Sequence, residues 1–129
     1  MEKNRIKYLI RWPLTVLVLH IILTYIGGYY WWEYIDKIMH TLGGMSIAAA
    51  TMQAIAYAKT KNIVGFIHPF LLISFVIAVV ALVAVGWEFF EFILDHTLRT
   101  NMQPSIADTM GDLLCGLIGG TMVAILKRK

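Results

Sequence analysis

Four long runs of apolar residues, separated by short polar or turn-forming segments, make up most of this sequence. They cover about residues 9–30, 35–57, 66–94 and 106–126. A helix needs about 20 mostly apolar residues to cross the hydrocarbon core of a bilayer. All four runs are long enough, and a helix satisfies its own backbone polar groups in lipid. The pattern therefore predicts an all-α, polytopic membrane protein in which residues 1–129 form a single domain, a four-transmembrane-helix bundle.

The start of the first run has two interpretations. Lys3, Arg5, Lys7 and Arg11 precede or open the apolar stretch, as the basic residues of a signal peptide do. The stretch is long, however, and no small-x-small cleavage site follows it. We interpret it as an uncleaved anchor, with Pro13 in the first helical turn, where proline is tolerated.

The basic residues predict the orientation of the bundle. Nine of the eleven Lys and Arg residues precede or open the first run, lie between the second and third, or follow the fourth: Lys3, Arg5, Lys7, Arg11, Lys59, Lys61, Lys127, Arg128 and Lys129. Lys37 and Arg99 are the exceptions. Because Lys and Arg concentrate in cytoplasmic loops, we expect a multi-pass protein of the cell membrane with both termini in the cytoplasm. The aromatic residues at 29–34 then mark the outer interface.

The composition supports lipid as the solvent. The chain is 59% hydrophobic and 15% charged, whereas a soluble domain carries about 25% charged residues. A chain this small could not bury so much apolar surface away from water. The net charge of +3 does not indicate a nucleic-acid partner, because the basic residues flank the spans and suit anionic lipid. Membrane lipid is the expected partner, and the single cysteine, Cys115, excludes an internal disulfide.

The acidic residues and one histidine form three stripes at helical spacing. The stripes are Asp36 with His40, then Glu88 with Glu91 and Asp95, then Asp108 with Asp112. Residues three, four or seven positions apart share one face of a helix. Spans two and four begin outside and span three ends outside, so all three stripes lie at a similar height. We expect them to converge near the outer end of the bundle.

Such a cluster predicts a bound divalent cation. Ionisable side chains within a span are costly and face a bundle interior or an aqueous cavity. Lys37 and Arg99 are too few to balance these carboxylates, which must otherwise be protonated. Carboxylates with one imidazole suit Mg²⁺, Mn²⁺, Ca²⁺, Fe²⁺ or Zn²⁺. The candidate metal ligands are Asp36, His40, Glu91, Asp108 and Asp112, and the candidate catalytic residues are Glu88, as general base, and Glu91.

Simpler interpretations remain open for part of the cluster. Asp36 and Asp108 lie where a carboxylate could cap a helix N-terminus. Asp95 and Glu33 could be interfacial and solvated, and Asp95 could also support the site from outside. These interpretations do not suit Glu88, Glu91 and Asp112, which lie inside apolar runs. His20, in the middle of the first run, has no acidic partner at helical spacing and is expected to pack.

Small residues indicate where helices approach closely. Gly44 with Ala48, and Gly116 with Gly120, are pairs spaced by four. Pairs of this kind allow close packing of membrane helices.

The three stripes also carry a family resemblance. The sequence contains a D-x-x-x-H at Asp36 and His40, an E-x-x-E at Glu88 and Glu91, and a D-x-x-x-D at Asp108 and Asp112. In this order, over residues 34–120, they resemble the YjdF-like bacterial and archaeal membrane proteins. More distantly they are similar to VanZ-like proteins, which are associated with glycopeptide resistance. The resemblance implies that these six residues are the characteristic positions of the family, and it supports the site without naming a reaction.

The chain departs from that family at three positions. Thr41 stands where an aromatic residue often follows the histidine, and Phe92 where tryptophan often follows the second glutamate. Gly116 stands where the relatives tend to have Asn or Asp. If that polar position is a ligand in the relatives, the site in this chain lacks it.

Three classes of function are compatible with these features. The first, which we favour, is a metal-dependent hydrolase or transferase acting on a lipid or lipid-linked headgroup at the outer leaflet. The second is a cation-binding or transport protein. No acidic stripe reaches the cytoplasmic half, and four helices make a thin pathway unless the protein forms a homo-oligomer. The third is an accessory membrane protein in which the polar cluster only stabilises helix packing.

Overall fold

The computed structural model describes residues 2–32 and 34–127, with side chains described from residue 9 onward. It contains the helices α1 (Glu2–Tyr25), α2 (Gly28–Trp31), α3 (Ile35–Thr60), α4 (Pro69–Leu98) and α5 (Ile106–Leu126). No strand occurs in these described ranges, so the all-α prediction is confirmed. Glu33, Arg128 and Lys129, and the side chains of Lys3, Arg5 and Lys7, lie outside the described residues.

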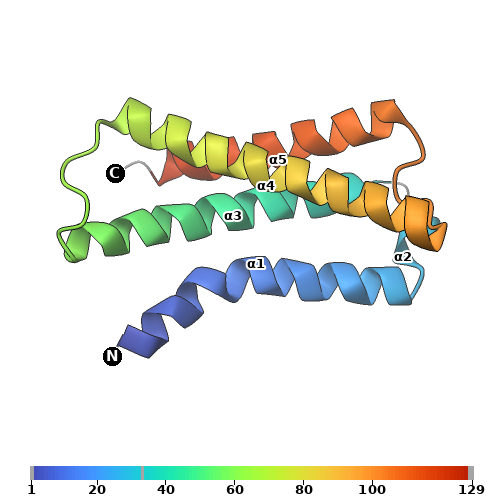
Figure 1. Ribbon diagram of the computed structural model, residues 1–129, viewed down its shortest axis with the longest axis horizontal. Coiled ribbons are helices and arrows are strands. Elements are labelled where there is room, and N and C mark those ends of the chain that lie inside the picture. The colour runs from blue at the N-terminus through green and yellow to red at the C-terminus, as the bar shows by residue number, and fades with distance from the viewer. Residues whose placement is uncertain (1, 33, 128–129) are drawn as a thin grey trace.

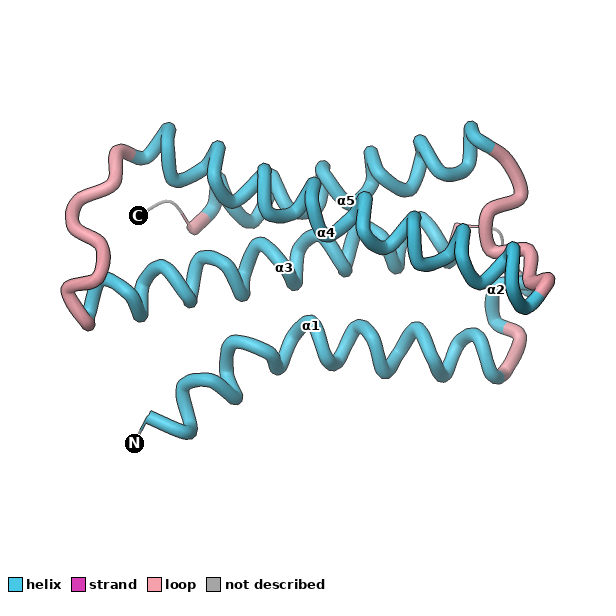
Figure 2. The backbone as a smooth tube through the Cα atoms, in the orientation of Figure 1, coloured by secondary structure: helices cyan, strands magenta, loops and turns pink. Residues whose placement is uncertain are grey.

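The four long helices run in alternating directions along one axis (Figure 1). The start of α1 and the end of α5 lie at one end of the molecule, and α2 lies at the other end with the loop of residues 99–105 (Figure 1). Figure 2 shows the connecting loops gathered at these two ends. Helix α3 packs against α1, α4 and α5, and α4 also packs against α5. The last two helices are therefore antiparallel neighbours (Figure 1).

The first apolar run folds differently from the prediction. Helix α1 ends at Tyr25, and the separate short helix α2 follows Gly27, which has a left-handed backbone (φ 72°) that favours glycine. The span predicted at 9–30 is thus interrupted. Pro13 also lies in the helix interior, because α1 begins at Glu2. Proline removes a helical hydrogen bond there, and α1 bends in its first half (Figure 1).

Glycines allow α3 and α5 to cross at close range. A methyl group on Gly44 would overlap the backbone of Gly116, and one on Gly119 would overlap the carbonyl of Thr41. These contacts confirm the close packing that the small residues predicted. They also bring the polar starts of α3 and α5 together.

The best-buried apolar side chains lie away from the carboxylates, deeper along the helices. Ala48, Val76 and Ala124 are fully buried, and Val80 is 1% exposed. They join α3, α4 and α5 in one core. This core closes the centre of the bundle below the polar stripes.

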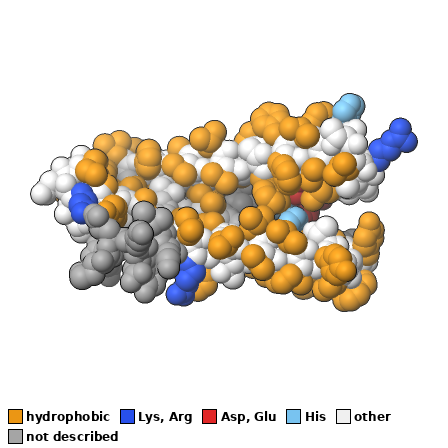
Figure 3. Space-filling view, turned by 60° about the horizontal axis from the view of Figure 1, so that its bottom comes forward, with side chains coloured by type: hydrophobic (Ala, Val, Ile, Leu, Met, Phe, Trp, Pro, Cys, Tyr) orange, Lys and Arg blue, Asp and Glu red, His pale blue; other side chains and the backbone are white. Residues whose placement is uncertain are grey.

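The outer faces of the helices are apolar. Phe75, Leu82, Phe89 and Phe92 of α4 are each more than half exposed, and apolar side chains cover much of the face in Figure 3. Continuous exposed apolar surface of this kind marks contact with lipid or a partner. By length and composition, α4 and α5 are able to cross a membrane, and α1 contributes a shorter apolar stretch, Leu9–Tyr25. The count of four spans remains a prediction.

Candidate functional site

The polar stripes of α3, α4 and α5 meet at the end of the bundle that carries α2. Ser105 is the N-cap of α5, and its hydroxyl accepts a hydrogen bond from the backbone N–H of Asp108 at 3.1 Å. Tyr34 occupies the N-cap of α3. Neither Asp36 nor Asp108 is therefore the N-cap residue of its helix, and both side chains take part in the cluster.

Lys37 pairs with both carboxylates in one half of the cluster. Its Nζ lies 2.6 Å from Oδ1 of Asp108 and 2.7 Å from Oδ1 of Asp112. The Asp112 side chain is only 2% exposed, so the ammonium group stabilises a carboxylate that water scarcely reaches. On the sequence alone, Lys37 and Arg99 counted as too few to balance the carboxylates, and Lys37 was not assigned to particular partners. The signal for its role was present, because Lys37 is the only basic residue in the outer half of a predicted span.

His40 lies among three carboxylates in the other half. Its Nδ1 is 3.8 Å from Oε1 of Glu88, and its Nε2 is 3.6 Å from Oδ1 of Asp36 and 3.8 Å from Oδ1 of Asp112. These separations are longer than hydrogen bonds. Each nitrogen of the imidazole therefore faces at least one carboxylate oxygen, and each of these N···O separations is wider than a hydrogen bond.

Glu88 and Glu91 are each fixed by one oxygen. Gln103 Nε2 donates to Oε2 of Glu88 at 2.7 Å and to its backbone carbonyl at 2.9 Å. Trp87 Nε1 donates to Oε1 of Glu91 at 2.7 Å. Both glutamates are buried, at 6% and 3% exposed. Oε1 of Glu88, the oxygen that faces His40, has no hydrogen-bond partner among the described residues.

These side chains form two groups that could bind a metal ion. One is His40, Glu88 and Glu91, and the other is Asp36, His40 and Asp112; in each group, one ligand atom per residue lies within 4.8 Å of the others. Two atoms that each bind an ion at about 2.0–2.2 Å are at most about 4.4 Å apart, so the 3.8 Å between His40 and Glu88 is suitable. Asp108 belongs to neither group, and its carboxylate is bound to Lys37.

The loop after α4 supports the cluster in a way that the sequence did not reveal. Asp95 accepts hydrogen bonds from the backbone N–H of Met102 at 2.8 Å and of Gln103 at 2.9 Å, and from the hydroxyl of Thr100. These bonds place Gln103 where its side chain reaches Glu88. Asp95 therefore supports the site from outside. The contact between Trp87 and Glu91 could have been expected from the sequence, because the two residues are one helical turn apart. Nothing in the sequence indicated the contact between Gln103 and Glu88.

His20 does more than pack. Its Nδ1 lies 2.5 Å from the hydroxyl of Tyr29, and its ring meets the edge of Trp87 at a centroid distance of 5.1 Å. Burial, followed by the charges of Asp36 and Glu91, raises the pKa of the Tyr29 phenol in the short helix α2. The hydroxyl therefore keeps its proton at neutral pH. His20 thus connects Tyr29 of α2 with Trp87, whose indole N–H donates to Glu91.

The fold and site define a small helical membrane protein with a buried carboxylate and imidazole cluster at one end. A family model described as "Predicted membrane protein (DUF2238)" matches residues 1–128. The chain belongs to this family of predicted membrane proteins. No curated protein and no solved structure matches it.

Proposed function

We propose that the protein is a membrane-embedded metalloenzyme that binds a divalent cation between His40, Glu88 and Glu91. In this proposal it hydrolyses or transfers a lipid or lipid-linked headgroup. The observation that carries the proposal is the buried Oε1 of Glu88, which faces His40 without a partner. A buried acceptor without a hydrogen bond costs about 1–3 kcal/mol, and more when it is charged. A bound cation would remove that cost.

The charges within the cluster support the same ion position. Lys37 pairs with Asp108 and Asp112, so that half has its own cation. The only ion-pair contact of Glu88 in the described part of the chain is with His40. Two carboxylates and an imidazole suit Mn²⁺, Fe²⁺ or Zn²⁺. We therefore assign the ion to the half that contains no lysine.

Asp36 and Asp112 have a different role in this proposal from the one that the sequence suggested. If Nδ1 of His40 binds the ion, Nε2 carries the proton and points toward these two carboxylates. Carboxylates commonly orient a metal-binding histidine through its second nitrogen. Asp36 and Asp112 then orient His40, and Glu88 becomes a ligand in place of a general base.

Three protein ligands leave coordination positions free for water or substrate, as in catalytic zinc sites. When bound, the ion would polarise a phosphoryl or acyl oxygen and lower the pKa of a coordinated water. Gln103 and Trp87 fix the two glutamates, and the apolar helices around them limit the access of water. The resemblance to YjdF-like and, more distantly, VanZ-like proteins supports joint action of these positions.

Transport is less well supported than catalysis. Ala48, Val76, Val80 and Ala124 are buried in the core, deeper along the helices than the site, and none of them offers a ligand to an ion. A cation bound at His40 therefore meets apolar side chains deeper in the bundle. Such a path is costly for an ion.

A lipid-turnover assay tests the proposal. The protein, reconstituted in mixed bacterial lipids, is treated with chelator and then given Mn²⁺, Fe²⁺ or Zn²⁺, and lipid products are measured by mass spectrometry. We expect turnover only with metal, and a loss of at least about 100-fold in His40→Gln. His96→Gln, at an exposed position of α4, is the matched control. No metal-dependent product, or equal turnover in the His40 variant, would refute the enzymatic proposal.

A further inference from the structure

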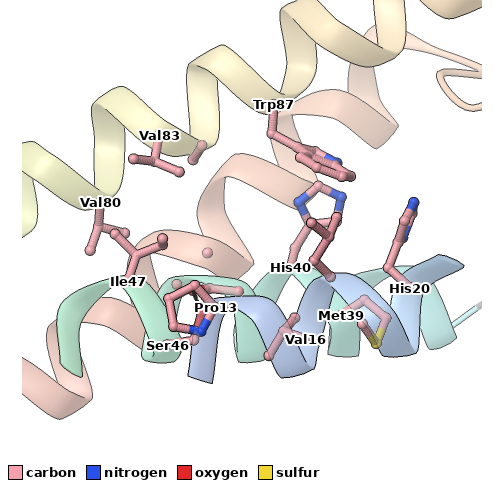
Figure 4. A pocket seen from close by; sticks show the side chains of 15 residues that line it. Pro13, Val16, His20, Met39, His40, Ser46, Ile47, Val80, Val83 and Trp87 are labelled. Atoms are coloured by element: carbon pink, nitrogen blue, oxygen red, sulfur yellow. Dashed lines mark hydrogen bonds between the residues drawn. The ribbon is translucent and has the colours of Figure 1, made fainter. Parts of the chain in front are cut away.

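Helices α1 and α4 enclose a cleft between them. Among the described residues, no Cα atom of α1 comes within 8 Å of a Cα atom of α4. A cavity of about 260 Å³ lies between α1, α3 and α4. In Figure 4, Val80 and Ile47 lie at one end of this cleft, and His40, His20 and Trp87 lie at the other.

The cleft is apolar along most of its length. Val16, Leu17, Ile47, Val80 and Val83 contribute to its wall. Among the other lining residues, Ser46 already donates its hydroxyl proton to the carbonyl of Gly43 at 2.8 Å. Ordered water needs two to four polar partners, so this part of the cleft does not suit water.

We infer that the cleft binds one hydrocarbon chain of a membrane lipid. Protein interiors are closely packed, and an unfilled apolar space of this size loses dispersion contacts along its walls. A helix from a second copy is about 10–12 Å wide with its side chains, and over the length of the cleft it would fill far more than 260 Å³. His40 and Ile47 are seven positions apart, which corresponds to about 10 Å along α3, so an extended chain segment fits beside them.

The position of the cleft makes its lipid a substrate candidate. His40 lines the cleft and also belongs to both potential metal-binding groups. Figure 3 shows acidic and imidazole side chains at the inner end of a notch beside α1. A chain lying in the cleft would therefore bring the attached headgroup to His40. Binding of the chain follows from the cleft alone, whereas the role of that lipid as substrate rests on the proposed function.

Gly43 allows the cleft to be filled without disturbing the fold. It lines the cleft, and an added Cβ there meets no atom within 4 Å. Gly86 is a matched control, because its added Cβ also meets nothing and it lies on the exposed face of α4. Gly43→Phe and Gly86→Phe therefore add the same ring in the cleft and outside it.

Photo-crosslinking tests the inference. The protein is reconstituted in vesicles of phosphatidylethanolamine and phosphatidylglycerol that contain a phosphatidylethanolamine with a diazirine in one acyl chain. After irradiation, mass spectrometry locates the adducts. We expect adducts at Val16, Leu17 and Val83, reduced about tenfold in Gly43→Phe and unchanged in Gly86→Phe.

Two results would overturn the inference. One is labelling that is equal at Phe89 and Phe92 on the outer face and unaffected by Gly43→Phe, which would indicate only surrounding lipid. The other is a wild-type cleft covered by a second copy, detected as protein–protein crosslinks at Leu17. Metal content is measured on the same samples. Wild-type protein that lacks metal but shows the expected adducts would refute the proposed function and leave the inference intact.

Discussion

At the scale of single residues, the cluster divides into two halves with different requirements. Asp108 and Asp112 are compensated by Lys37 at 2.6 and 2.7 Å. Glu88 and Glu91 have neutral donors on one oxygen each, and the free Oε1 of Glu88 faces His40. The first half has the features of a structural ion pair, and the second has the features of a ligand set.

Removing Lys37 is expected to destabilise the fold. Lys37→Met leaves the carboxylate of Asp112 buried without a cation, and we expect the free energy of unfolding to fall by about 2–3 kcal/mol. Breaking a fully buried ion pair costs about 3–5 kcal/mol. The cost is lower here because Lys37 is partly exposed. Thermal unfolding in detergent measures this cost. The double variant with Asp112→Asn should recover part of the loss. An unchanged melting temperature in Lys37→Met would contradict the structural role of this pair.

Gln103 is expected to tune the ion site without binding the ion. Gln103→Ala removes the donor that orients Glu88, and losses of such outer partners typically reduce metal affinity about 10- to 100-fold. Titration of the metal-free protein measures the change. Gln53→Ala, in α3 away from the cluster, provides the control. Equal affinities of the Gln103 variant and the wild type would show that the loop does not position Glu88.

At the scale of helices, the glycine contact between α3 and α5 brings the polar stripes together. A side chain on Gly44 would overlap the backbone of Gly116, whereas one on the neighbouring Gly43 would meet open space. The two positions lie in the same helix one residue apart. Alanine variants at these two positions therefore separate the effect of helix packing on stability from the effect of helix propensity.

Gly44→Ala is expected to lower stability and Gly43→Ala to raise it. Overpacking at Gly44 costs about 1–3 kcal/mol. Replacing a glycine in an open helical position gains about 0.5–1 kcal/mol. The two melting temperatures in detergent should therefore shift in opposite directions. A Gly44→Ala variant as stable as the wild type would mean that α3 and α5 are not in close contact here.

Sequence patterns predicted the helices better than the details of the site. The last run, at 106–126, coincides with α5, because Ser105 caps it and the apolar run ends with the helix. The break of the first run at Gly27 was missed, because the glycine lies in a continuous apolar and aromatic stretch. The role of Gln103 depends on tertiary hydrogen bonds to Asp95, which leave no periodic signal.

At the scale of the whole molecule, the start of α1 and the end of α5 lie at the end of the bundle opposite α2 (Figure 1), and the cluster lies at the α2 end. This arrangement follows from four antiparallel long helices. It is compatible with cytoplasmic termini and a site near the outer leaflet. The orientation itself remains a prediction from the basic residues.

Membrane topology can be tested with two labels. A reporter fused after residue 129 should be active only in the cytoplasm, and Asn101→Cys, in a Cys115→Ala background, should react with an impermeant maleimide from outside. The physical reason is that Lys and Arg are concentrated near the two chain termini and between the second and third apolar runs, as in cytoplasmic segments. Labelling of Asn101→Cys only after permeabilisation would place the cluster on the cytoplasmic side.

The metal content of the purified protein tests the central claim most directly. Wild-type protein, Glu88→Gln, Glu91→Gln and the His96→Gln control are loaded with metal, desalted and analysed by mass spectrometry, and their melting temperatures are measured with and without chelator. We predict about one ion per chain and chelator-sensitive melting for the wild type and His96→Gln. Both glutamate variants should lose the ion and the thermal shift. Metal-free wild-type protein with chelator-insensitive melting, together with neutral or stabilising glutamate variants, would contradict the ion site.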